Sequence, residues 1–328
     1  MKLTRCILGC LIGLALAVPA IAAQPQPDSY PNRPIKLVVS FPPGGGADTT
    51  ARWLAQQMGE RLGQPVIVEN KPGANGLVGT DAVAKAAPDG YTILMTDRGA
   101  LGINPSLYAQ LPYDPRKDFA HIGIAADGPY VLVVSSALPV ANLADLVKLA
   151  KSKPGGLRYG SYGVGSMAQL DIEALARAEG ISLQHVPYKG APPAVAATVA
   201  GEVDLTIASP PSLLGFIHNG RLRALAVGSD TRLALLPGVP TIREAGVSSQ
   251  PLIPTFFALS APAGTPRAIV ERLNEELRHA VQSPAMSDKL RAAGLVPDGG
   301  SPAEMTRIVS EDVDRFAALV KEIGIKAD

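Results

Sequence analysis

The sequence predicts an α/β fold in two lobes, each built on a mostly parallel sheet flanked by helices. Apolar, strand-like runs alternate with helix-like stretches along the chain, which is the pattern of parallel sheets covered by helices. The length of 328 residues suits two domains. The pattern also changes character near residues 126–130 and 250–256. Two such crossings indicate a hinge, with a cleft that closes on a ligand.

The first lobe is expected to comprise residues 30–127 and 252–328. Its early part predicts, in chain order, a strand at 35–41, a helix whose apolar residues include Ala51, Leu54, Ala55, Met58 and Leu62, a strand at 66–70, a helix at 78–87 and a strand at 91–96. After the second crossing, a strand and loop at 256–264 precede a long helix that starts at Pro266, and two more helices follow.

Residues 128–251 are expected to form the second lobe. Strands are predicted at 130–136, 157–161, 183–186, 203–208 and 222–228, with helices at 142–152, 166–180, 192–201 and 210–220. Asn142 is a predicted N-cap, and Gly180 is placed to end its helix.

The first 22 residues read as a cleaved signal peptide. Lys2 and Arg5 precede the apolar run "CILGCLIGLALAV", and "AIA" supplies small residues at the cleavage position. A membrane span is the alternative, but the run is shorter than the roughly 20 residues a span needs. Export to the periplasm is therefore expected, followed by a Pro-rich arm at 24–33 that we expect to be poorly ordered.

Removal of the signal peptide changes the chemistry that remains. Both cysteines, Cys6 and Cys10, lie within it, so the mature chain has no thiol, disulfide or cysteine metal site. The formal net charge of +1 becomes −1, with 28 basic and 29 acidic residues. That balance argues against a nucleic-acid binder, which would carry a basic excess.

The stretch "FPPGGGADTTAR", at 41–52, places three glycines between a strand and a helix. It lacks the Gly-Lys-Ser/Thr ending of a phosphate-binding P-loop, with Asp48 where the lysine would be needed, and it lacks the G-x-G-x-x-G spacing. Free backbone N–H groups and a helix N-terminus suit a carboxylate instead. The alternative is a tight turn that holds no ligand.

A second loop, "YGSYGVGS" at 159–166, also joins a strand to a helix, with Ser166 as the expected N-cap. The nucleophile pattern G-x-S-x-G fails at both Ser161 and Ser166. His185 is a conceivable base, but nothing in the sequence near it orients its ring. Serine hydrolysis is therefore disfavoured.

Other candidate groups are scattered along the chain. The four histidines lack metal-ligand spacing, so neither a metal nor a cofactor is expected. Arg98 follows the third strand, where it is placed to pair with a second ligand carboxylate; the alternatives are a surface pair with Asp97 and an interlobe contact. Tyr188 and Lys189 precede a helix that starts with proline, so its N-terminus is a further candidate for the cleft wall; Lys189 in water is the alternative.

Several motifs together resemble the tripartite tricarboxylate transporter substrate-binding proteins, the TctC or Bug family of periplasmic receptors. The resemblance covers nearly all of the mature chain and implies a type 2 periplasmic binding protein fold. The motifs are "YPNRPIKLVVSFPPGGGADTTAR", "VIVENKPGANGLVGTDAVAKAAPDGYTIL", "INPSLY", "HVPYKG", "GEVDL", "GRLRALAV", "PGVPTIREAG" and "LSAPAGTP".

The resemblance implies a small carboxylate ligand, held between the two glycine loops by backbone amides and bridging waters. One departure is "TDRGALG", where many relatives have a small, uncharged run, so Asp97 and Arg98 are expected to alter the distal half of the pocket. Arg98 is expected to bind a second carboxylate there or to stack on an aromatic acid. The ligand is expected to meet Phe41, Pro42, Gly44, Gly45, Gly46, Asp48, Thr96, Arg98, Ser161, Gly163, Val164, Gly165, Ser166, Tyr188 and Ser209.

The function that follows is capture of a di- or tricarboxylate, an amino acid or an aromatic acid, and delivery to a two-component membrane permease driven by an ion gradient. A monomer is expected. One alternative is a sensor that presents its ligand state to a histidine-kinase ectodomain. The other, an extracytoplasmic enzyme on the same fold, lacks the catalytic patterns it would need.

Overall fold

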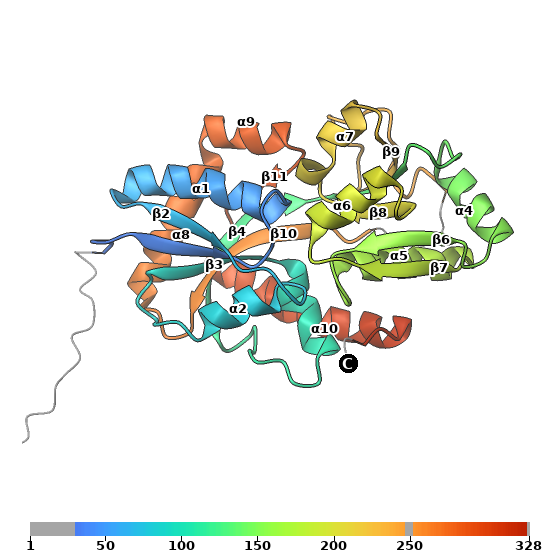
Figure 1. The fold of residues 1–328 in the computed structure, drawn as a ribbon. Coiled ribbons are helices and arrows are strands. Elements are labelled where there is room, and N and C mark those ends of the chain that lie inside the picture. Colours follow the sequence, from blue (N-terminus) through green and yellow to red (C-terminus); the bar gives the residue numbers. More distant parts are fainter. Residues whose placement is uncertain (1–29, 247–251, 327–328) are drawn as a thin grey trace, which may run out of the picture.

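Two β-sheets form the centres of two lobes in the computed structural model, which describes residues 30–246 and 252–326 (Figure 1). The first sheet has the order β11-β4-β10-β3-β1-β2 and the second β7-β6-β8-β5-β9. The first contains β1 (Ile35–Val39), β2 (Val66–Asn70), β3 (Thr92–Asp97), β4 (Phe119–Gly128), β10 (Thr255–Pro262) and β11 (Val296–Pro297). The second contains β5 (Tyr130–Ser135), β6 (Leu157–Ser161), β7 (Leu183–Pro187), β8 (Leu205–Ala208) and β9 (Leu222–Gly228).

Helices cover both faces of these sheets. They are α1 (Gly46–Leu62), α2 (Leu77–Ala84), the π-helix η2 (Gly99–Ile103), α3 (Asn104–Leu107), α4 (Leu143–Ser152), α5 (Met167–Glu179), α6 (Ala191–Ala200), the 3-10 helix η3 (Pro210–Ser212), α7 (Leu214–His218), α8 (Arg267–Gln282), α9 (Pro284–Ala292) and α10 (Pro302–Ile323). Within the described ranges, no helix has both the length and the apolar character needed to cross a membrane. The α/β fold expected from the alternating pattern is confirmed.

The sheets are mixed, which corrects the expectation of mostly parallel pairing. Strand β1 pairs in parallel with β2 and β3, and β6 pairs in parallel with β7 and β8. The pairs β4–β10 and β5–β9 are antiparallel. The cause is the connection between lobes, because β4 and β5 carry the chain out of the first lobe while β9 and β10 bring it back.

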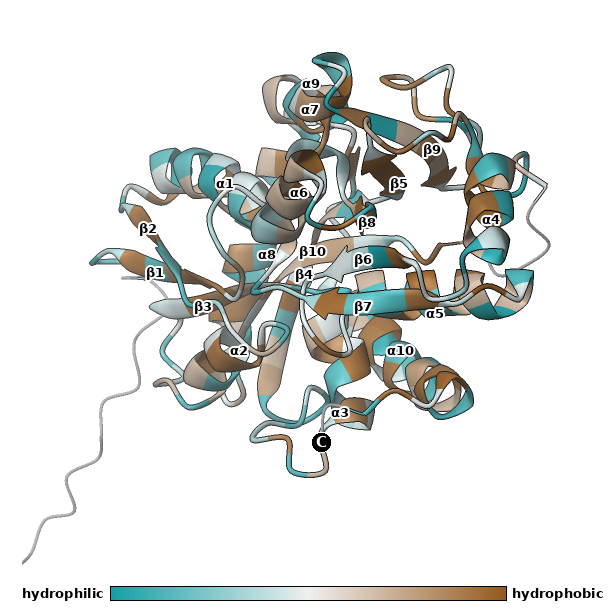
Figure 2. Ribbon diagram, turned by 45° about the vertical axis from the view of Figure 1, so that its right-hand side comes forward, coloured by the Kyte–Doolittle hydropathy of each residue, from teal (hydrophilic) through white to brown (hydrophobic). Residues whose placement is uncertain are grey.

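The strands fold because their side chains alternate between two apolar layers. In β1, Ile35, Leu37 and Val39 pack in the cluster that includes α1 and α8, while Val38 packs on the opposite face with Val83 of α2. Figure 2 shows polar residues along the outer side of α1. The predicted cap at Asn142 is confirmed, since its Oδ1 accepts the N–H of Asp145 at 2.9 Å.

The C-terminal helix α10 contacts both lobes, and runs beneath them in Figure 1. Its Phe316 and Val320 belong to the apolar core built mainly on the second sheet, together with Leu107. Arg177 of α5 donates to the backbone oxygen of Glu322 at 2.7 Å. We propose the lobe division at 30–127 with 252–328 and at 128–251, and α10 then ties the two lobes together.

Three further expectations have different outcomes. The proposed signal peptide, residues 1–22, lies outside the described residues. Part of the expected disordered arm is held in place, since Tyr30 donates to the Gly90 carbonyl at 2.8 Å and Arg33 pairs with Asp89 at 2.9 Å. The sequence patterns also missed β4 and the helical segment formed by η2 and α3. Both have too few polar residues for a clear repeat of apolar and polar positions.

Candidate functional site

The first glycine loop joins β1 to α1 and is fixed by Asp48. Gly44 has φ +86°, a conformation that favours glycine, and Gly45 is an N-cap with no side-chain acceptor. The carboxylate of Asp48 accepts the N–H of Gly44 at 3.0 Å and the amide of Asn70 at 2.9 Å. This leaves the first N–H groups of α1 without a side-chain cap, as an anion site requires.

The electrostatics of Asp48 suit this supporting role. Burial raises the pKa of its carboxyl, but hydrogen bonds from Arg52, Gly44 and Asn70, with the charge of Arg52, outweigh that effect and lower it overall. Arg52 donates to both carboxylate oxygens, at 2.9 and 3.0 Å. Asp48 therefore shapes the loop, and its charge is already neutralised.

The second glycine loop, between β6 and α5, is held by its own side chains. Gly163 and Gly165 have φ of +135° and +76°. The N–H of Gly165 donates to Gln169 Oε1 at 2.6 Å, and Ser166 caps α5 by accepting the N–H of Gln169. The exposed tip of the loop, Gly163 and Val164, remains available to the cleft.

A third loop, between β2 and α2, was missed as a binding element. Four successive residues, Gly73 to Gly76, have positive φ, including Ala74 at +46° and Asn75 at +51°. Strained non-glycine backbone of this kind gathers at binding sites. The signal in the sequence was "PGANG", which places glycine and asparagine between a strand and a helix as in the other two loops.

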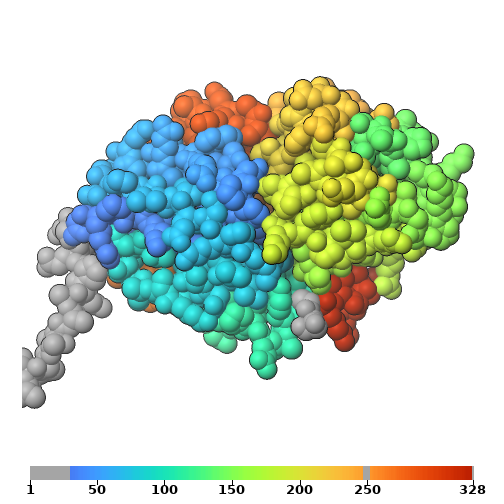
Figure 3. All heavy atoms as spheres, viewed as in Figure 1, coloured from blue at the N-terminus to red at the C-terminus, as the bar shows by residue number. Residues whose placement is uncertain are grey.

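The lobes are in contact where these loops meet. A Cβ on Gly190 would lie 2.5 Å from Pro42 Cγ, and one on Gly46 would lie 2.6 Å from Ser209 Oγ. Asn75 donates to the carbonyl of Gly165 at 3.4 Å. Figure 3 shows the blue and cyan surface of the first lobe directly against the yellow surface of the second. The structure is therefore a closed arrangement of the cleft.

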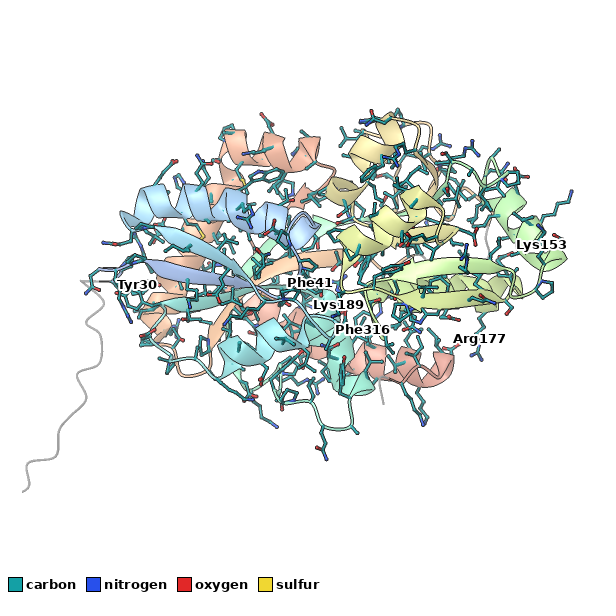
Figure 4. The ribbon with its side chains drawn as sticks, viewed as in Figure 1. Tyr30, Phe41, Lys153, Arg177, Lys189 and Phe316 are labelled. Carbon is teal, nitrogen blue, oxygen red and sulfur yellow. The ribbon has the colours of Figure 1, made fainter. Side chains whose placement is uncertain are left out.

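A cavity of about 300 Å³ lies between the lobes at this contact. All three loops line it, together with the end of β7. Among the described residues around it, Lys189 is the one that carries a charge. The lining residues are Phe41, Pro42, Gly73, Ala74, Asn75, Gly76, Tyr108, Tyr162, Gly163, Val164, Pro187, Tyr188, Lys189 and Gly190. Figure 4 shows the labelled Phe41 and Lys189 beside one another where the lobes meet.

A smaller cavity of about 30 Å³ lies deeper and shares Phe41, Pro42 and Tyr162 with the larger one. The N-terminus of α1 enters its wall from one lobe and that of α6 from the other. Its remaining lining residues are Gly45, Gly46, Ala47, Asp97, Tyr130, Ala191, Pro192, Ser209, Thr255 and Phe257. Burial raises the pKa of Asp97 to about 7, although N–H groups of Ala100 and Gly99 lower it in part.

The structure divides the expected site residues into two groups. Eight line the cavities, namely Phe41, Pro42, Gly45, Gly46, Gly163, Val164, Tyr188 and Ser209. Seven lie outside both linings, namely Gly44, Asp48, Thr96, Arg98, Ser161, Gly165 and Ser166. Most of the second group supports the loops; Thr96, for example, bonds Ser40 through the two hydroxyls at 2.8 Å.

Arg98 lines neither of these two cavities, and its expected contact with the ligand stays a prediction. Its Nε donates to Asp312 Oδ2 at 2.8 Å, its Nη1 donates to the carbonyl of Pro254, and the guanidinium lies 4.8 Å from the ring centroid of Phe256. Asp97, the last residue of β3, lines the small cavity instead.

Ser161 and His185 form a pair that the sequence did not indicate. They lie on the neighbouring parallel strands β6 and β7, with Ser161 Oγ 2.6 Å from His185 Nε2. The ring of His185 stacks on Tyr159, at 5.0 Å between centroids. The Ser161 hydroxyl also donates to the Gly163 carbonyl, and the residue is 0% exposed. This geometry braces the loop and gives a substrate no access to the hydroxyl.

Metal-ligating side chains are not grouped in the part of the chain that the structure describes. There, no three or more His, Cys, Asp or Glu side chains are gathered so that they could hold a metal ion.

Comparisons with known proteins agree on one family. A family model described as "Tripartite tricarboxylate transporter family receptor" matches residues 50–325. The chain is 38% identical over 327 residues to Protein BugT of Bordetella pertussis (strain Tohama I), with 99% of each chain covered.

Solved structures extend the similarity to the fold. The R. palustris protein Rpa4515, solved with adipate, is 36% identical with a TM-score of 0.87, covering 90% of this chain and 99% of that chain. MatC of Rhodopseudomonas palustris, solved with bound malate, is 30% identical with a TM-score of 0.83, covering 89% of this chain and 100% of that chain. Both similarities span the two sheets and the loops between them.

Proposed function

The chain belongs to the tripartite tricarboxylate transporter receptor family, whose members are periplasmic solute-binding receptors, and from this premise we propose that it captures a small organic carboxylate between its lobes. The observation that carries the proposal is the cavity of about 300 Å³ walled by three strand-to-helix loops rich in glycine. Such loops present backbone N–H groups, and helix N-termini favour negative charge.

The class of ligand is proposed from the lining and from the relatives. Two related receptors were solved with adipate and with malate, both small carboxylates. In this chain, a carboxylate near the start of α1 would meet the N–H groups of Gly46 and Ala47, which line the deeper cavity. The body of the ligand would lie between Tyr108, Tyr188 and Lys189 in the larger cavity.

Delivery to a two-component membrane permease is proposed as the next step. The receptor would act as a monomer in the periplasm, after removal of the signal peptide at 1–22. A histidine-kinase ectodomain is the alternative partner. Uptake of a labelled ligand in strains with and without this chain separates the two. Deletion of a transport receptor abolishes uptake, whereas deletion of a sensor leaves the uptake rate of an already expressed transporter unchanged.

Binding is tested by thermal unfolding with mono-, di- and tricarboxylates, aromatic acids and amino acids, each next to its neutral amide. Ligand at about 100 times its dissociation constant stabilises the folded state by about 2.7 kcal/mol. A rise in melting temperature with an acid, and none with its amide, supports the proposal. Unchanged melting temperatures across the whole panel refute it. Carboxylate esters added to the panel test turnover, which a receptor does not show.

A further inference from the structure

Asp97 is an acidic side chain in a cleft proposed to bind an anion. It ends β3, is 7% exposed and lines the small cavity together with the start of α1. Its Oδ1 accepts the N–H of Ala100 at 3.1 Å. A buried carboxylate beside an anion site repels the anion and lowers its affinity, so the presence of Asp97 there needs an explanation.

The groups that face Asp97 supply little positive charge. Arg98, which follows Asp97 at the start of η2, lowers the pKa of Asp97 slightly, but its guanidinium is bonded to Asp312. The other titratable neighbours are phenols, Tyr113 after α3, Tyr130 on β5 and Tyr162 after β6, and burial raises the pKa of each. These phenols are uncharged near neutral pH, so they leave the negative charge of an ionised Asp97 available to a cation.

The small cavity fits the head of a ligand. Its volume of about 30 Å³ corresponds to about two water-sized groups. Gly46 and Ala47 lie on its wall at the positive end of α1, and Asp97 lies on the same wall from β3. The shared residues Phe41, Pro42 and Tyr162 connect it to the larger cavity, which receives the rest of the ligand.

We propose that Asp97 selects amino acids among small carboxylates, by accepting the ligand's ammonium group while the start of α1 binds the neighbouring carboxylate. The inference rests on the proposed function. An ammonium is required because a buried carboxylate is stabilised by an opposite charge far more than by a neutral hydroxyl.

The direction of the pH dependence follows from this pairing. An ammonium binds ionised Asp97 and lowers its pKa in the complex, so affinity for an amino acid falls as the pH drops below about 7. Between pH 8 and pH 6 the ionised fraction, and with it the affinity, falls about tenfold. A ligand with a carboxylate but no ammonium prefers protonated Asp97, so its affinity changes in the opposite direction.

The experiment is calorimetric titration with matched pairs that differ only in the ammonium group: aspartate and succinate, phenylalanine and 3-phenylpropionate, leucine and 4-methylpentanoate. Wild type is compared with Asp97→Asn, which removes the charge at nearly constant volume. Asp127→Asn is the control, because Asp127 is partly buried and has a pKa raised to about 6, yet lines a different cavity with Arg98.

For at least one pair, the wild type is expected to bind the amino acid at least about tenfold more tightly than its partner. Asp97→Asn is expected to lose that preference and Asp127→Asn to keep it. An equal preference in wild type and Asp97→Asn overturns the inference while leaving the proposed function intact. Absence of binding by every carboxylate refutes both. If Asp97→Asn does not fold, the wild-type pH profiles decide, because affinities that change in the same direction for both members of a pair contradict the inference.

Discussion

The guanidinium of Arg98 lies 2.8 Å from the carboxylate of Asp312 and joins the end of β3 to α10. Both side chains are largely buried, at 13% and 8% exposure. Burial raises the pKa of Asp312, and the neighbouring Arg98 offsets part of that rise. This pair gives Arg98 a structural role, which we propose in place of the expected ligand contact.

Arg98→Ala is therefore expected to lower stability and leave binding unchanged. Removing one partner of a buried pair costs about 3 kcal/mol, because the other group is left buried without its counter-charge. Urea unfolding measures the loss, and calorimetry should give a ligand affinity within about twofold of wild type. Arg307→Ala removes the exposed pair with Glu311 and should cost less than about 1 kcal/mol. A large loss of affinity at unchanged stability would contradict this prediction and indicate that Arg98 contacts the ligand.

Gly46→Ala is expected to weaken ligand binding. The new Cβ would meet the ring of Phe257 and lie 2.6 Å from Ser209 Oγ, a residue of the other lobe. Overpacking of this kind costs about 1–3 kcal/mol, which corresponds to about 5–150-fold in affinity when it falls on the closed state. Gly215→Ala is the matched control, since no atom lies within 4 Å of its Cβ position. Equal affinities for the two variants would contradict contact between the lobes at Gly46.

Asp48→Asn is expected to destabilise the first glycine loop by about 1–3 kcal/mol, because hydrogen bonds from Arg52 and Gly44 lose their charged acceptor. The folded-state pKa of Asp48 lies below its usual value, so the difference from wild type is present above about pH 4 and shrinks as the pH falls further. Urea unfolding from pH 3 to 7 measures this. Exposed Asp288→Asn should stay within about 0.5 kcal/mol of wild type at each pH. A gap that persists below pH 3 argues against the charge as its source.

His121 is expected to make the protein less stable in acid. Its ring bonds Ser260 Oγ at 3.0 Å and faces the Pro115 carbonyl at 3.1 Å, and burial lowers its pKa to about 4. The stabilising effect of the neutral ring is complete above about pH 6.5 and is lost as the pH falls towards 4, by about 3 kcal/mol. His121→Gln should remove this part of the pH dependence, and His279→Gln, at an exposed site, should not. Parallel curves for wild type and His121→Gln would contradict it.

Lys189→Ala is expected to reduce affinity for ligands with a second carboxylate by up to about fivefold, since an exposed ion pair contributes up to about 1 kcal/mol. The effect should shrink at high salt, because exposed charges are screened. Lys153→Ala is the control, since Figure 4 places Lys153 at the far end of the second lobe, remote from Lys189 and the cleft. An equal change for both variants would assign the effect to net charge.

Much of the fold could be predicted from the sequence, because local stereochemistry determines many strands, helices and caps. The strand at β2 and the caps at Asn142 and Gly180 were placed correctly, because β-branched runs, side-chain caps and left-handed glycines act within a few residues. Strand β4 was not found, because nearly all of its residues are buried and few are polar, so no period-two alternation marks it. The third loop at 73–76 was missed although "PGANG" marks it, because only the fold shows that it faces the other two loops.

By itself, the sequence determined the α/β alternation, the positions of the glycine loops and the family to which they are similar. Only the tertiary structure decided which loops face one another and which side chains enter the cleft. Arg98 packs against α10 because Asp312, more than two hundred residues later, lies within 2.8 Å of it. Asp97 lines the small cavity together with Tyr130 and Tyr162, which only the fold brings to the end of β3. Such directions depend on distant partners, which no local pattern encodes.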